Sequence, residues 1–155
     1  MDMLTALAIA VGVLVAVWVK VGSMMGVYWF IGAIGWACFS AGGGKMNGGL
    51  MKAIPAGVLG MTLAAMSELV SMLGGHPELE WVALGVAAFI VVIAGKVRLL
   101  SFFPAGLCGL SVVGAGGVMG IMDLATNVKL GIAFIAGAVV GYVAEAAAGM
   151  VAKKA

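Results

Sequence analysis

Charged side chains are scarce in this sequence. Asp, Glu, Lys and Arg make up 9% of its 155 residues, whereas 65% of the residues are hydrophobic. Because so few charges cannot cover the exterior of a water-soluble domain, most of the exterior must face lipid. The composition therefore predicts a protein of the lipid bilayer, and it offers no basic surface for a nucleic acid.

Metal-binding and catalytic residues are equally scarce. The single histidine, His76, has no second ligand type at a useful spacing, which argues against a metal site. Cys38 and Cys108 form no CxxC pair and lie within apolar stretches, where a thiol behaves as a small apolar group. Because no Ser/His/Asp or Cys/His set can be assembled, the sequence predicts neither an enzyme nor a bound cofactor.

Apolar stretches of about 20 residues fill nearly all of the chain. Such a stretch crosses a ~30 Å hydrocarbon core as one helix, so the sequence predicts an all-α integral membrane protein with a single domain. The first stretch lacks a basic region before it and reads as a retained helix, not as a signal peptide. The six expected spans cover residues 4–22, 24–42, 50–73, 79–97, 99–117 and 129–150.

The basic residues predict the orientation of these spans. Lys and Arg prefer the cytoplasmic side of short loops. Six spans with both chain ends in the cytoplasm leave only Lys20 and Lys129 outside. We therefore expect both termini to be cytoplasmic, together with the basic residues Lys45, Lys52, Lys96, Arg98, Lys153 and Lys154.

The two halves of the sequence resemble each other. The run F-I-G-A-I-G-W-A-C-F-S-A-G-G-G at 30–44 recurs loosely as F-P-A-G-L-C-G-L-S-V-V-G-A-G-G at 103–117, and the third spans are also similar. With three spans in each half, the second copy must enter the membrane inverted. We expect two inverted three-helix repeats, about 1–75 and about 76–155. A chance bias toward Gly and Ala is the alternative explanation.

Pro104 lies inside the fifth expected span, followed by Gly106 and Gly109. Proline removes a backbone donor and disfavours helical geometry at the preceding Phe103, which predicts a broken fifth helix. In lipid, non-helical backbone is tolerated only against protein or a watery cavity. The break therefore predicts a pore-lining element, and a simple proline kink packed against a neighbour is the alternative.

Small residues recur every four positions in the third and sixth spans, and each stripe includes a glutamate. This spacing lets helices approach closely in lipid, so both carboxylates should point toward protein. A glutamate inside a span is a functional-site hypothesis, and a hydrated interfacial position is the alternative. Asn47 and Asn127 precede these spans and are expected to cap them. The stripes are Ala56, Gly60, Ala64 and Glu68, and Ala133, Gly137, Gly141, Glu145 and Gly149.

Three motifs carry a family resemblance. They are L-L-S-F-F-P-A-G-L-C-G at 99–109, G-I-A-F-I-A-G-A-V-V-G-Y at 131–142 and G-W-A-C-F-S-A-G-G-G at 35–44. With them, most of the chain resembles the bacterial inner-membrane family called domain of unknown function 1097. The resemblance implies a small six-helix inner-membrane protein without an established catalytic role, and it brings no active-site residues with it.

We expect a channel or transporter for a small solute, with its pathway between the two inverted halves. The scarcity of buried charge favours an uncharged or weakly polar solute such as urea, an amide, ammonia or a short alcohol. A proton-coupled carrier that uses Glu68 is a variant. A non-transporting structural or partner-binding subunit is the alternative. Small-residue grooves also predict a homo-oligomer. The expected solute-binding residues are Trp36, Ser40, Gly43, Glu68, Phe103, Pro104, Gly106, Cys108 and Ser111.

Overall fold

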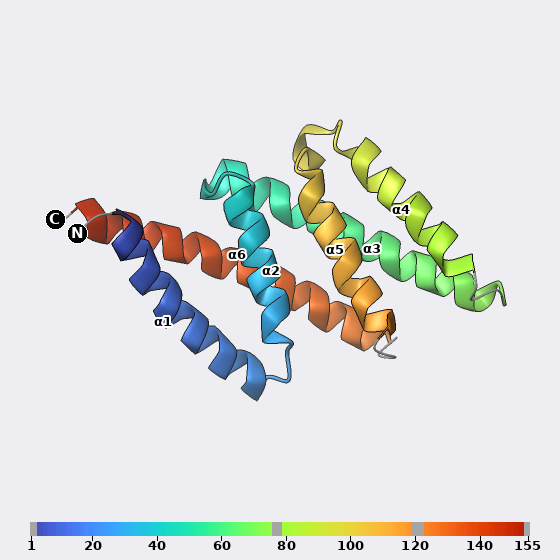
Figure 1. Cartoon of the computed structure of the whole chain (residues 1–155), viewed down its shortest axis with the longest axis horizontal. Coiled ribbons are helices and arrows are strands. Elements are labelled where there is room, and N and C mark those ends of the chain that lie inside the picture. The colour runs from blue at the N-terminus through green and yellow to red at the C-terminus, as the bar shows by residue number, and fades with distance from the viewer. Residues whose placement is uncertain (1–2, 76–78, 119–122, 154–155) are drawn as a thin grey trace.

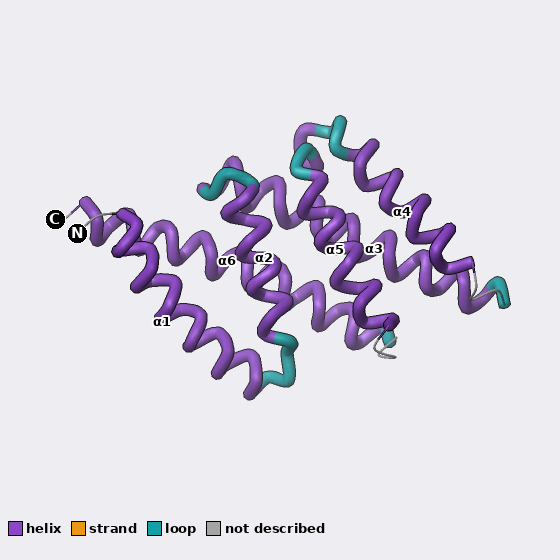
Figure 2. Tube along the Cα trace, in the orientation of Figure 1, coloured by secondary structure: helices purple, strands orange, loops and turns teal. Residues whose placement is uncertain are grey.

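The computed structural model describes residues 3–75, 79–118 and 123–153, and these residues form six α-helices and no strand (Figures 1 and 2). A π-helical turn, Lys45–Leu50, leads into the third helix, and a 3₁₀ turn, Arg98–Leu100, precedes the fifth. The helices are α1 (Met3–Met24), α2 (Trp29–Ala41), α3 (Met51–Leu73), α4 (Glu80–Ala94), α5 (Phe103–Val118) and α6 (Leu124–Lys153).

Three helical segments are long and apolar enough to cross a membrane: Leu7–Met24, Lys45–Leu73 and Leu124–Met150. The all-helical expectation is therefore confirmed. The other three helices are shorter than expected, with 13 residues in α2, 15 in α4 and 16 in α5. At a rise of 1.5 Å per residue, α2 extends only about 20 Å, which is less than the thickness of a hydrocarbon core.

Four helices form one layer, and α3 and α6 lie behind it (Figure 1). Along the layer the order is α1, α2, α5, α4, with α2 in contact with both α1 and α5. Behind it, α6 packs against α1 and α2, and α3 packs against α5 and α4. The rear helix α6 therefore packs mainly on the two helices that precede α3 in the chain, and α3 packs mainly on the two helices that precede α6.

The backbones of α2 and α6 touch where they cross. A Cβ atom added to Gly35 would collide with the carbonyl group of Phe134, and one added to Gly137 would collide with Gly32. In lipid, apolar side chains gain little by leaving the solvent, so helices associate through close packing at small residues. These glycines are therefore required for the contact between the two helices.

The crossing of α5 and α3 is built in the same way. A Cβ atom on Gly60 would collide with the carbonyl group of Gly106, and one on Gly109 would collide with Gly57. The small-residue stripe expected in the third span thus lies at a helix–helix contact, as predicted from its spacing.

Pro104 begins a helix and does not break one. It is the second residue of α5, which runs without interruption to Val118. In the first turn of a helix the missing N–H group of proline costs little. The interruption lies before α5, at Ser101 and Phe102, and Gly106 lies in regular helix. The expectation of a fifth helix broken at Pro104 is corrected accordingly.

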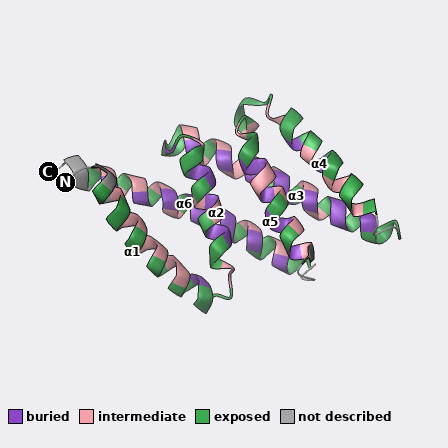
Figure 3. Cartoon of the chain, viewed as in Figure 1, coloured by how far each residue is buried: buried purple, intermediate pink, exposed green. Residues whose placement is uncertain are grey.

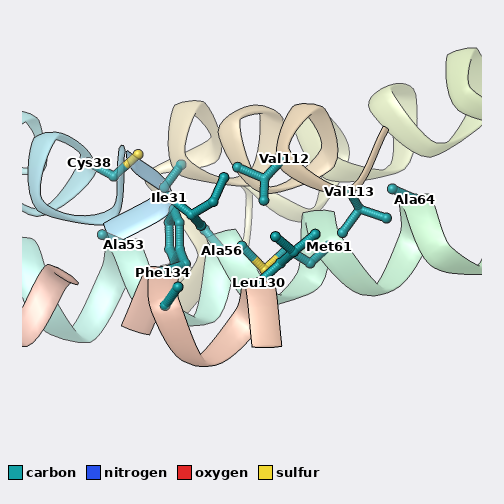
Figure 4. Close-up of a cluster of buried hydrophobic side chains, with 12 residues drawn as sticks. Ile31, Cys38, Ala53, Ala56, Met61, Ala64, Val112, Val113, Leu130 and Phe134 are labelled. Atoms are coloured by element: carbon teal, nitrogen blue, oxygen red, sulfur yellow. The ribbon is translucent and has the colours of Figure 1, made fainter. Parts of the chain in front are cut away.

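The buried residues concentrate on α2, α3, α5 and α6, whereas α1 and α4 lie at the edges of the layer (Figure 3). Phe39 and Phe134 have no exposed surface. In the core cluster, Leu130 and Phe134 of α6 lie among side chains of α2, α3 and α5, such as Ile31 and Val112 (Figure 4). The contacts of this cluster join all four inner helices.

Two glycines in α5 can be used to test the close helix crossings. Gly109→Ala should lower the free energy of unfolding by about 1–3 kcal/mol, because the added methyl group overpacks the contact with Gly57. Gly114→Ala is the control, since a Cβ atom there has no neighbour within 4 Å. Thermal unfolding in detergent measures both variants, and equal stabilities would contradict the crossing.

Candidate functional site

One pocket lies where the end of α3 meets the start of α6, and we call it the Glu68 pocket. Its volume is about 310 Å³. Oxygen-bearing side chains from both helices and from the residue before α6 line one part of it, and apolar side chains line the rest. The polar residues are Thr62, Glu68, Asp123 and Asn127, and the apolar residues are Ala65, Met66, Leu69, Met72 and Leu124.

Glu68 is the most unusual residue of this pocket. Its side chain is 5% exposed, and its Oε1 atom accepts no hydrogen bond within the described part of the chain. The amide of Asn127 donates a hydrogen bond to the carboxylate. A buried polar atom without a partner is costly, and an ionisable residue within a membrane span marks a functional site by default. This burial argues against the alternative of a hydrated, interfacial Glu68.

Asp123, and not Asn127, caps α6. Asp123 directly precedes the helix, and its carboxylate accepts hydrogen bonds from the hydroxyl and the backbone N–H group of Thr126. These bonds, and the nearby charge of Lys129, lower the pKa of Asp123, so this residue is ionised at neutral pH. Asn127 lies inside α6, where it contacts Glu68. Sequence reasoning therefore missed both Asp123 and Asn127 as residues of the pocket.

A second pocket lies at the opposite end of the same two helices, and we call it the Glu145 pocket. Its volume is about 450 Å³. The carboxylate of Glu145 packs directly on Gly44, which precedes the π-helical turn and has a positive φ of 58°. Unlike Glu68, Glu145 is only partly buried and shares its pocket with a lysine. The lining residues are Leu7, Lys45, Met46, Tyr142, Glu145 and Ala146.

Glu68 and Glu145 occupy matching positions on the two rear helices. Each lies eight residues beyond a glycine, Gly60 or Gly137, that packs directly on the backbone of the helix in front. Each also faces the start of the other rear helix. The lining residues Met46 and Thr62 are 16 positions apart, so roughly 25 Å of helix separates the two pockets.

An apolar groove follows the contact between α2 and α5, and we call it the α2–α5 groove. Its volume is about 380 Å³. Two of the expected pore-lining residues, Cys108 and Ser111, lie in it, and Cys108 is within hydrogen-bonding reach of the buried Cys38. The Ser111 hydroxyl donates to the Leu107 carbonyl at 2.9 Å. The lining residues are Phe30, Ile31, Ile34, Leu107, Cys108, Ser111, Val112 and Ala115.

The other expected site residues lie apart from these three cavities. Trp36 packs over Gly141 of α6, and Gly106 is buried against the Ala56 carbonyl of α3. The remaining expected residues are exposed and lie near the end of α2 and the start of α5, namely Ser40, Gly43, Phe103 and Pro104. Within the described ranges no three His, Cys, Asp or Glu side chains gather into a metal-binding group.

A protein-family model described as "protein of unknown function (DUF1097)" matches residues 8–149. The chain belongs to this family. A relative, the uncharacterized protein YahC of Escherichia coli (strain K12), is 29% identical over 166 residues, which cover 94% of this chain and 90% of YahC. No solved structure matches the chain. The membership confirms the resemblance seen in the three sequence motifs.

The burial of the Glu68 carboxylate, whose Oε1 atom has no hydrogen-bond donor in the described part of the chain, predicts a gain of stability when its charge is removed. Glu68→Gln should raise the free energy of unfolding by about 1 kcal/mol at neutral pH, because a buried neutral amide costs less than a buried charge. Glu145→Gln is the control and should change it by less than about 0.5 kcal/mol, since Glu145 is partly exposed. Thermal unfolding in detergent measures the stability of both variants. A Glu68→Gln variant less stable than the wild type would show that the carboxylate stabilises the fold.

Proposed function

We propose that this protein is a channel or transporter for a small solute in the bacterial inner membrane, with its pathway between two inverted repeats. One observation carries the proposal. Two pockets lie at opposite ends of α3 and α6, and each combines a glutamate of one helix with the start of the other. A pathway needs an entry at each face of the membrane, and the two pockets suit this role.

The helix packing supports the two repeats, about 1–75 and about 76–155. Under an inverted repeat α1, α2 and α3 correspond to α4, α5 and α6, and every main contact has its counterpart: α2 on α6 matches α5 on α3, and α1 on α6 matches α4 on α3. The same sequence separation relates Gly60 to Gly137 and Glu68 to Glu145. With the third helices exchanged in this way, α2 and α5 meet between the two halves, and this supports a pathway along the α2–α5 groove.

The lining of the α2–α5 groove supports an uncharged or weakly polar solute. Its walls are apolar apart from Cys108 and Ser111. A charged solute would lose its hydration there without replacement, whereas an uncharged or weakly polar molecule such as ammonia, urea or a small amide loses little. Thr126, which precedes Asn127 of the Glu68 pocket in α6, lines a small apolar cavity together with Ile31 and Val112 of the groove. The groove and the pocket are therefore neighbours.

The proposal includes the membrane arrangement. The short α2, α4 and α5 cross the bilayer with the help of their connecting turns, so that the chain has six spans. Large apolar side chains are exposed along α1 and α4, among them Val13, Val17 and Phe89, and these suit contact with lipid or with further copies of the chain in a homo-oligomer.

Transport is the first test. In proteoliposomes, the protein should speed the entry of at least one of urea, acetamide, methylamine and glycerol over empty liposomes, measured by stopped-flow light scattering or pH change. Gly109→Ala and Gly114→Ala, compared per folded molecule, separate lost function from lost fold. An absence of flux for the whole panel with well-folded protein would favour the non-transporting subunit.

Topology is the second test. Reporter domains fused after residue 155 should be active in the cytoplasm, and reporters inserted between Gly75 and Leu79 should be active in the periplasm, because basic residues concentrate at the opposite ends of the spans. Activity of the C-terminal fusion only in the periplasm would invert the arrangement and exchange the faces of the two pockets.

A further inference from the structure

We propose that the Glu68 pocket binds a small ammonium ion, that is, ammonium itself or a short protonated amine. This inference deepens the proposed function, on which it rests, by naming the class of solute that enters. The neutral amine is then the form that suits the apolar α2–α5 groove, and the pocket concentrates its charged form at one face.

The charges around the pocket favour a cation. Glu68 and Asp123 both line it, and Glu80 at the start of α4 is close enough to repel the Glu68 carboxylate. Lys129 lies near Asp123, but within the described ranges no lysine or arginine pairs with Glu68. The Oε1 atom of Glu68 remains without a hydrogen-bond donor. A cationic N–H donor in the pocket would offset the charge of the Glu68 carboxylate and add a hydrogen bond to it.

The pocket offers acceptors to such a ligand. The Thr62 hydroxyl donates to the Val58 carbonyl at 2.8 Å, so its oxygen presents lone pairs. Asn127 uses its amide N–H in the bond to Glu68 and keeps its carbonyl oxygen as an acceptor. Ammonium ions carry several N–H donors and no acceptor, which is the complement of this arrangement.

The apolar part of the lining separates an amine from a bare metal cation. Ala65, Met66, Leu69, Met72 and Leu124 present carbon and thioether sulfur, which cannot replace the water around a potassium or sodium ion. The methyl or ethyl group of a short alkylammonium ion fits against such a surface. The inference is therefore specific for an ammonium ion with at most a short apolar substituent.

The Glu145 pocket provides an internal control. It holds an equivalent carboxylate, but Lys45 shares the pocket and supplies a positive charge already. Its glutamate is also partly exposed, so leaving the carboxylate without a protein hydrogen bond costs less free energy. The two matching positions should therefore differ in cation binding, with the ammonium ion preferring the Glu68 pocket.

The test is the thermal unfolding of the purified protein in detergent, with methylammonium chloride replacing potassium chloride at constant ionic strength. A ligand that binds only the folded state raises the unfolding temperature in a saturable way. We expect this rise for the wild type and for Glu145→Gln. In Glu68→Gln, the apparent affinity should fall by about tenfold or more, because the charge-assisted hydrogen bond is lost.

Three results would overturn the inference: no difference between the two salts, an equal rise with potassium chloride alone, or an unchanged affinity in Glu68→Gln. Flux distinguishes this failure from that of the proposed function. Transport of urea or acetamide without methylammonium binding leaves the transporter in place and removes the ammonium site. Saturable methylammonium binding without flux of any solute leaves the ammonium site in place and removes the transporter.

Discussion

Contact between helix backbones at glycines is the constraint on which this structure depends. A membrane helix gains little by hiding apolar side chains from lipid, so the pairs α2–α6 and α5–α3 are held by close approach at Gly35, Gly137, Gly60 and Gly109. Each crossing fixes the register of a rear helix. Glu68, about two turns beyond Gly60, is thereby placed at the start of α6, and the pocket follows from the crossing.

The unequal helix lengths create the pockets. Together with its π-helical turn, α3 covers Lys45–Leu73, and α6 has 30 residues. Both are therefore much longer than the short helices in front of them. At the ends of these two helices each glutamate lies beside the start of the other rear helix, and a pocket lies at each of the two places. A buried glutamate whose Oε1 atom lacks a hydrogen-bond donor within the described residues supports the proposed binding site, since stability is often given up where a site functions.

Much of this arrangement could be predicted from local patterns. The apolar stretches predicted helices, and the spacing of Ala56, Gly60 and Ala64 before Glu68 predicted a face turned toward protein. Helix ends were harder, because the placement of Pro104 depends on whether a helix starts or continues there, and both are compatible with the same residues. Asn127 could not be recognised as a partner of Glu68, since their contact joins segments whose relative position is fixed by packing alone.

The exchange of the rear helices has a consequence for the order of folding. The main support of α1 and α2 is α6, which begins at Leu124, whereas α2 ends at Ala41. The helices α1 and α2 therefore lack their partner α6 while the middle of the chain is synthesised. The final structure can close only after α6 has been inserted, which makes assembly a late event with long-range contacts. Neither half of the chain, made separately, would contain the helix on which its first two helices pack.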